Sequence, residues 1–99
     1  MKEPRPTQPE IVFDALVNGS TYSHIEGCNI LHMGCYQRIV SKLIHDFGIP
    51  VESVSVKNVT NDGYHNIYFL RPTIRRAIQE NNLNLYDAGR YFANPTLAL

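Results

Sequence analysis

The sequence predicts an α+β fold in which three helices precede a two-stranded hairpin and two further helices follow it. Three observations predict this order: two helix-start signals near the N-terminus, a change of hydrophobic spacing from about 3.6 to about 2 residues near position 50, and an Asp-Gly turn between two runs of β-branched and aromatic residues. The chain has 99 residues, 43% of them hydrophobic and 18% charged, which is enough for one domain with one core.

The first helix follows a short tail. Residues 1–8 combine prolines with mixed charges and predict a flexible tail. Thr7 and Glu10 have the spacing of a capping box, so we expect a helix near residues 9–18. Gly19 is expected to end it, because glycine adopts the left-handed conformation of a helix C-terminus without strain.

A second capping box predicts the second helix, near residues 23–30. Its hydroxyl acceptor is Ser23 and its glutamate is Glu26. The side chains that we expect to face inward are Ile25, Cys28 and Ile30.

The strongest helical pattern covers residues 35–47, where apolar side chains recur three and four positions apart. Gly48 and Pro50 end this third helix. Its expected core residues are Tyr36, Ile39, Val40, Leu43, Ile44 and Phe47.

The hairpin is expected over residues 51–70. Its strands cover residues 51–59 and 64–70, and the turn between them contains Asp62 and Gly63, which tolerate the backbone conformations of hairpin turns. Because both strand faces carry large apolar groups, we expect one face to pack on the helices and the other to be partly covered.

Two more helices are expected after the hairpin. Thr73 is the predicted cap of a helix over residues 74–80, and Asn84 is the predicted cap of a helix over residues 84–92. Their expected inward residues are Ile74, Ala77, Ile78, Leu85, Ala88 and Phe92.

The stretch from Gly34 to Val51, with the sequence GCYQRIVSKLIHDFGIPV, resembles the third helix and first wing strand of small winged helix-turn-helix proteins of phages and prophages. With the preceding helix and the following hairpin, the resemblance covers residues 8–70. It implies a DNA-binding domain over residues 9–70. Residues 72–99 match nothing in this family, and with the two helices expected there we interpret residues 71–99 as a C-terminal helical extension. The chain lacks the basic pair that this family often carries before the glycine that ends the helix.

The polar face of the third helix is the first candidate DNA-binding surface. Arginine pairs with guanine and glutamine with adenine in the major groove, which accommodates a helix. The alternative is an ordinary solvated helix face. The candidate residues are Gln37, Arg38, Ser41, Lys42 and His45.

The hairpin tip is the second candidate surface, where polar side chains can donate to DNA phosphates. The alternative is a hairpin that only packs. Its candidate residues are Lys57, Asn58, Thr60 and Asn61, with His65 as a further donor, whereas the carboxylate of Asp62 opposes phosphate binding. Three arginines follow the hairpin: Arg71, Arg75 and Arg76. They either contact phosphates or keep a helix soluble, and the sequence favours neither interpretation.

Charge and hydropathy restrict the partners. Nine basic and nine acidic side chains give a net charge of zero, which argues against a purely electrostatic nucleic-acid binder. Residues 38–76 nevertheless hold six basic and three acidic side chains. Because no apolar run reaches the length of a membrane span and no signal peptide is evident, we expect no membrane partner and a cytoplasmic location. The resemblance to phage and prophage DNA-binding proteins implies that this is the cytoplasm of a bacterial host, with the nucleoid.

Catalytic and metal chemistry have weak sequence support. Two histidines and two cysteines, His24, Cys28, His32 and Cys35, are zinc-ligand types, but their spacing requires a helix to continue through an expected turn. The chain contains no phosphate-binding glycine loop and no paired-carboxylate motif. We therefore expect no enzyme, no metal and no cofactor.

The sequence thus predicts a sequence-specific protein that binds double-stranded DNA, either a small transcriptional regulator or a recombination-directing factor. The alternative is an interaction module that binds a host protein. Apolar side chains in residues 73–92 exceed the needs of two short helices, which predicts a homodimer through this segment. Alternatively, they only cover the hairpin and the first helix.

Overall fold

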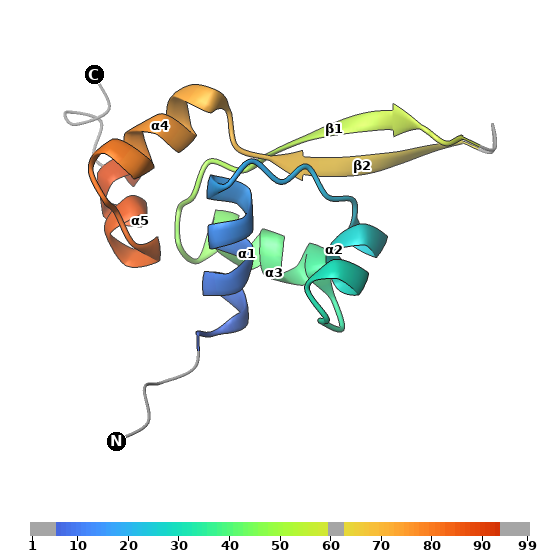
Figure 1. The fold of residues 1–99 in the computed structure, drawn as a ribbon, viewed down its shortest axis with the longest axis horizontal. Coiled ribbons are helices and arrows are strands. Elements are labelled where there is room, and N and C mark those ends of the chain that lie inside the picture. Colours follow the sequence, from blue (N-terminus) through green and yellow to red (C-terminus); the bar gives the residue numbers. More distant parts are fainter. Residues whose placement is uncertain (1–5, 60–62, 94–99) are drawn as a thin grey trace.

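The computed structural model describes residues 6–59 and 63–93 and has an α+β architecture (Figure 1). The predicted order of elements is confirmed, with ends shifted by one or two residues. The elements are α1 (Gln8–Val17), α2 (His24–Ile30), α3 (Tyr36–His45), β1 (Glu52–Lys57), β2 (Tyr64–Phe69), α4 (Pro72–Glu80) and α5 (Leu85–Ala93).

Both predicted capping boxes form. At the start of α1, the Glu10 N–H donates to Thr7 Oγ1 over 3.4 Å and the Thr7 N–H donates to Glu10 Oε1 over 3.1 Å. Ser23 and Glu26 make the same two bonds before α2, at 3.2 and 3.1 Å. Each box satisfies backbone N–H groups that have no partner inside the helix. Gly19 follows α1 with a φ of +100°, as predicted.

The hairpin projects beyond the helices on the side of α2 (Figure 1). β1 and β2 pair antiparallel. The chain just before α2 runs along the outer edge of β2, where the Tyr68 N–H donates to the Tyr22 carbonyl over 3.0 Å and Ser23 forms a bridge with Ile67. Within the described residues, no backbone segment pairs with the outer edge of β1.

One core joins α1, α3, α4, α5 and the loops beside them. α1 packs against α3, while α2 lies at one end of α3 and α4 and α5 lie at the other (Figure 1). Residues of the C-terminal helices therefore belong to the same core as the N-terminal ones. The buried apolar residues are Val12, Phe13, Leu16, Met33, Tyr36, Val40, Leu43, Ile49, Leu70, Ile78, Leu85 and Ala88.

The predicted core was wrong at three isoleucines. Ile25, Ile30 and Ile44 are exposed, Ile25 by 70%. α2 is a single short helix whose buried residue is Gly27, so its larger apolar side chains remain at the surface. On α3 the buried stripe is narrower than predicted and leaves Ile44 at its margin.

One further core expectation needs correction. The apolar spacing of the first helix predicts a stripe of Ile11, Val12, Ala15 and Leu16, and the structure buries Phe13 as well. The outer face of the hairpin is partly covered, as expected: Ile67 and Phe69 are half-buried, whereas their neighbours Val54 and Val56 are 47% and 37% exposed.

α4 closes the C-terminal end of α1. It begins at Pro72, and Thr73 is therefore inside the helix and is not the predicted cap; proline suits a first turn because its φ is already helical. Arg75 Nε and Gln79 Nε2 donate to the Val17 carbonyl over 3.0 and 3.2 Å. These two side chains satisfy a carbonyl that α1 itself leaves unpaired.

α5 docks against the loop after α3. Its predicted cap is confirmed, because Asn84 Oδ1 accepts from the Asp87 N–H over 2.8 Å. Gly89 is buried so closely against the Phe47 backbone that a Cβ atom would lie 2.2 Å from the Phe47 oxygen. Beside this contact the rings of Phe47 and Tyr86 meet edge to face, with centroids 5.5 Å apart.

Candidate functional site

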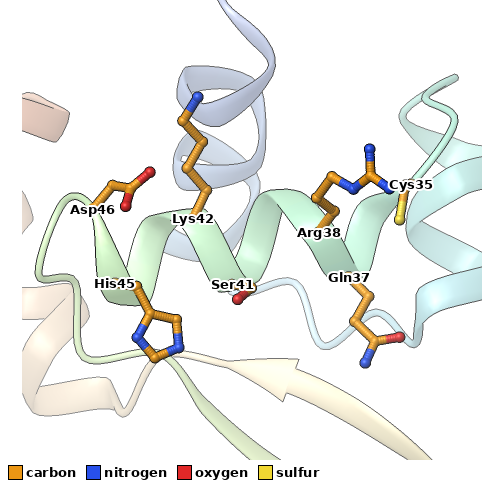
Figure 2. Close-up of a pocket in the computed structure, with 7 residues that line it drawn as sticks. All are labelled: Cys35, Gln37, Arg38, Ser41, Lys42, His45 and Asp46. Carbon is orange, nitrogen blue, oxygen red and sulfur yellow. The ribbon is translucent and has the colours of Figure 1, made fainter.

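The exposed face of α3 carries the five α3 residues that the sequence predicts as binding residues (Figure 2). They form two rows with a repeat of four positions, as one side of a helix requires. Figure 2 shows Gln37, Ser41 and His45 along the edge nearer the hairpin, and Arg38 and Lys42 along the opposite edge. All five side chains are exposed.

These side chains, with Cys35 and Asp46, line a shallow depression of about 570 Å³. The arginine supplies a planar fork of donors, and the glutamine supplies both a donor and an acceptor. Lys42 and His45 stand in the last turn of α3, where positive charge is favoured by the helix dipole. The surface is therefore polar and cationic along one edge, with a single carboxylate at its end.

The opposite side of α3 fixes the orientation of this face. Tyr36, Val40 and Leu43 are fully buried along it. The ring of Tyr36 contacts the rings of Tyr22 and Tyr68, with centroids 6.3 and 6.0 Å away. Its hydroxyl has no hydrogen-bond partner among the described residues, and burial raises the pKa of Tyr36 to about 12.

Side chains from α2 cap the start of α3. Cys35, at the N-cap position, makes no side-chain cap bond. Instead, His24 Nδ1 accepts from the Gln37 N–H over 3.1 Å, and Cys28 Sγ accepts from the Tyr36 N–H over 3.3 Å. The sequence interpretation considered His24 as a metal ligand and Cys28 as a metal ligand or an inward-facing side chain, and it missed this role. Their spacing of four residues shows a shared helix face, but not the direction in which that face points.

The cap also determines where the His24 ring carries its proton. Nδ1 can accept from an N–H only when it is unprotonated, so the neutral ring carries its proton on Nε2. Nε2 lies 3.8 Å from Cys28 Sγ, the atom that receives the Tyr36 N–H. The imidazole and the thiol therefore act together as one cap for the first turn of α3.

The predicted hairpin residues fall into three groups. Lys57 is exposed at the end of β1. Asn58 is half-buried, and its Oδ1 is hydrogen-bonded to His65 Nδ1. Thr60 and Asn61 lie outside the described residues.

A second depression, of about 710 Å³, lies between α2, the start of α3 and the hairpin. Gln37 lines both depressions and thus connects the α3 face to Asn58, whereas Arg38 and Lys42 line only the first. Asn66 was missed by the sequence interpretation, although an asparagine inside a strand is an unusual residue choice. The lining residues are Ser23, His24, Ile25, Glu26, Gln37, Asn58, His65, Asn66 and Tyr68.

Two of the three arginines after β2 have structural partners. Arg71 forms an ion pair with Glu52, and Arg75 caps α1, which leaves Arg76 exposed on α4. In residues 6–59 and 63–93, no group of three or more His, Cys, Asp or Glu side chains is arranged to hold a metal ion. No helix in these ranges is both long enough and apolar enough to cross a bilayer.

The chain matches no family model, no curated protein and no solved structure. The geometry of α3 and the hairpin is therefore the basis on which a function is assigned.

Proposed function

We propose that the chain is a sequence-specific DNA-binding protein of the winged helix-turn-helix type, with α3 in the major groove and the hairpin as the wing. The α+β order of the elements supports this proposal. So does the position of the hairpin, whose inner face meets α3 through the rings of Tyr68 and Tyr36.

The exposed face of α3 carries the proposal. A helix enters the major groove, where an arginine fork pairs with guanine and a glutamine amide with adenine. Arg38 and Gln37 are adjacent, exposed and free of acidic neighbours in the first turn of α3. Ser41, which is small, lies in the row between Gln37 and His45 and allows close approach of a base edge. Lys42 is suited to a phosphate.

The biological role that we propose is a small phage or prophage transcriptional regulator, or a recombination-directing factor. Such a protein needs no cofactor and works in the bacterial cytoplasm, with the nucleoid. Self-association through residues 73–92 stays a prediction. Most apolar side chains of this segment pack into the core of the same chain. Tyr86 is the large apolar side chain that the segment exposes.

Substitutions on the two rows test the proposal. After selection of a preferred duplex from a random pool, Arg38→Ala should weaken binding to that duplex by about 1–3 kcal/mol, the usual value of one bidentate base contact. Lys42→Ala should weaken preferred and random duplexes alike and reduce the salt slope by about one. Fluorescence anisotropy at several salt concentrations measures both effects.

Arg90→Ala is the matched control, because Arg90 is an exposed arginine on α5. It should leave the affinity close to that of the wild type. If the wild type selects no duplex, or if Arg38→Ala and Lys42→Ala bind as the wild type does, the DNA proposal fails. The host-protein alternative then gains, and two observations favour it: the net charge of zero and the exposed Ile25 beside the second depression.

A further inference from the structure

The hydrogen-bond ladder of the hairpin defines which groups of β1 point outward. The Asn58 N–H donates to the Gly63 carbonyl over 2.9 Å, so residues 58 and 63 are a hydrogen-bonded pair. Along an antiparallel ladder, hydrogen-bonded pairs alternate with pairs whose backbone groups point away from the partner strand. From the register of β1 and β2, the backbone N–H and C=O groups of Ser53, Ser55 and Lys57 must therefore point away from β2.

The other edge of the hairpin agrees with this alternation. Tyr68 lies opposite Ser53, and its N–H points away from β1 toward the Tyr22 carbonyl. The outer edge of β2 is thus occupied by the chain before α2. The outer edge of β1 offers three N–H and three C=O groups that no other described backbone segment pairs with.

This edge also lacks the usual protection against pairing. Natural edge strands carry inward charges, prolines or bulges that prevent another strand from adding to them. Between its charged ends, Glu52 and Lys57, β1 has only serines and valines. Val54 and Val56 are both exposed on the outer face.

We propose that β1 pairs with β1 of a second copy of this chain, antiparallel and about a two-fold axis at Ser55. A two-fold axis brings the same surface of both subunits into contact, so the outer edge of β1 meets the outer edge of β1 in the partner subunit. Ser55 then faces Ser55 of the partner subunit, and Ser53 faces Lys57 of the partner subunit. In this register every outward N–H and C=O group of residues 53, 55 and 57 meets its complement.

The side chains agree with the same register. Val54 faces Val56 of the partner subunit, so the four valines form one apolar strip across the new strand pair, and aliphatic cross-strand neighbours stabilise a sheet. The two Lys57 side chains lie at opposite ends, whereas a register centred on Lys57 would oppose like charges. Because the outer edge of β2 is already occupied, this sheet does not extend beyond two chains.

The dimer is a four-stranded sheet with both inner faces on the same side. In this register odd-numbered residues of one chain face odd-numbered residues of the other, and paired residues place their side chains on the same face of a sheet. The two-fold axis is therefore perpendicular to the sheet. Each inner face contacts α3 of its own chain through Tyr68 and Tyr36. Both α3 helices therefore lie on one side of the joint sheet. This arrangement does not depend on DNA binding.

Charge substitutions at the axis test the interface in the absence of DNA. Sedimentation equilibrium of the full chain between low micromolar and millimolar concentration should show a dimer. Ser55→Lys and Ser55→Glu should each be monomeric where the wild type is dimeric, because like charges meet at the axis. An equimolar mixture of the two variants should restore the dimer. Ser55→Ala, which also loses the bond from Ser55 Oγ to Asn66, should still dimerise.

Amide hydrogen exchange gives an independent readout. The Ser55 amide should become protected as concentration rises, whereas the Val54 and Val56 amides, which point toward β2, should be protected at all concentrations. A wild type that stays monomeric at millimolar concentration overturns the proposal. So does a dimer that survives both charge substitutions, and its interface would then be sought at residues 73–92 with Tyr86→Ala.

Discussion

At the scale of single residues, Tyr36 combines two opposing contributions. Its ring lies at the centre of the core and contacts two other tyrosine rings, which favours folding. Its hydroxyl loses its hydrogen bonds to water without gaining a partner among the described residues, which opposes folding. The hydroxyl and the ring of Tyr36 can therefore be separated by substitution.

Tyr36→Phe should leave the free energy of unfolding at neutral pH unchanged or raise it by up to about 1 kcal/mol, because it removes only the unpaired hydroxyl. Burial raises the pKa of Tyr36 from 10.0 to about 12, so the native state keeps a proton that the unfolded chain releases. The wild type should then lose stability as the pH rises from 10 to 12, and Tyr36→Phe should lose less.

Urea denaturation at neutral and alkaline pH checks both statements. A loss of more than about 1 kcal/mol at neutral pH would show that the hydroxyl has a stabilising partner.

At the scale of elements, the features that could be predicted from the sequence are those that depend on residues close together along the chain. The capping boxes of α1 and α2 depend on residues three positions apart, and both were found from the sequence. The exposed rows of α3 followed from helical spacing in the same way. The cap of α3 was not predictable, because His24 and Cys28 reach it from another helix through the tertiary fold. The same reason explains why the exposure of Ile25 was missed.

Gly27→Ala should destabilise the protein by about 1–3 kcal/mol, the range for overpacking a core. The new Cβ would lie 2.1 Å from Tyr36 Cγ, the ring atom bonded to the Tyr36 Cβ, and not at the far end of a flexible side chain. Alanine normally favours a helix over glycine by up to about 1 kcal/mol, so a net loss measures the clash between α2 and α3.

Gly34→Ala is the control, since nothing lies within 4 Å of a Cβ at Gly34. Its unfolding midpoint should match that of the wild type. Equal midpoints for Gly27→Ala and Gly34→Ala would mean that α2 does not pack on the Tyr36 ring.

At the scale of the whole molecule, residues 72–93 are part of one core and not an appendage. Ile78, Leu85 and Ala88 are buried together with residues of α1 and α3. The sequence resemblance extended only to residue 70, so it could not predict where α4 and α5 dock. Their docking depends on side chains that are distant in sequence, such as Arg75 on Val17 and Gly89 on Phe47.

Gly89→Ala should displace α5 and lower the free energy of unfolding by about 1–3 kcal/mol. The Cβ would lie 2.2 Å from a backbone oxygen, which cannot rotate away as a side chain can. Thermal unfolding measures the loss, and the ring resonances of Phe47 and Tyr86 in NMR spectra should shift with it. Arg90→Ala, on the same helix, should change neither quantity. Wild-type ring resonances in Gly89→Ala would contradict this docking of α5.

The closure of α1 by α4 has a consequence for synthesis on the ribosome. Arg75 and Gln79 follow Val17 by 58 and 62 residues, so α1 is translated well before the helix that supplies the donors to its C-terminal end. Until Gln79 has left the exit tunnel, the Val17 carbonyl lacks at least one of its two donors. The nascent chain therefore carries α1 without both of these donors while the 62 residues from Val17 to Gln79 are translated, and α1 is completed long after its own residues have been made.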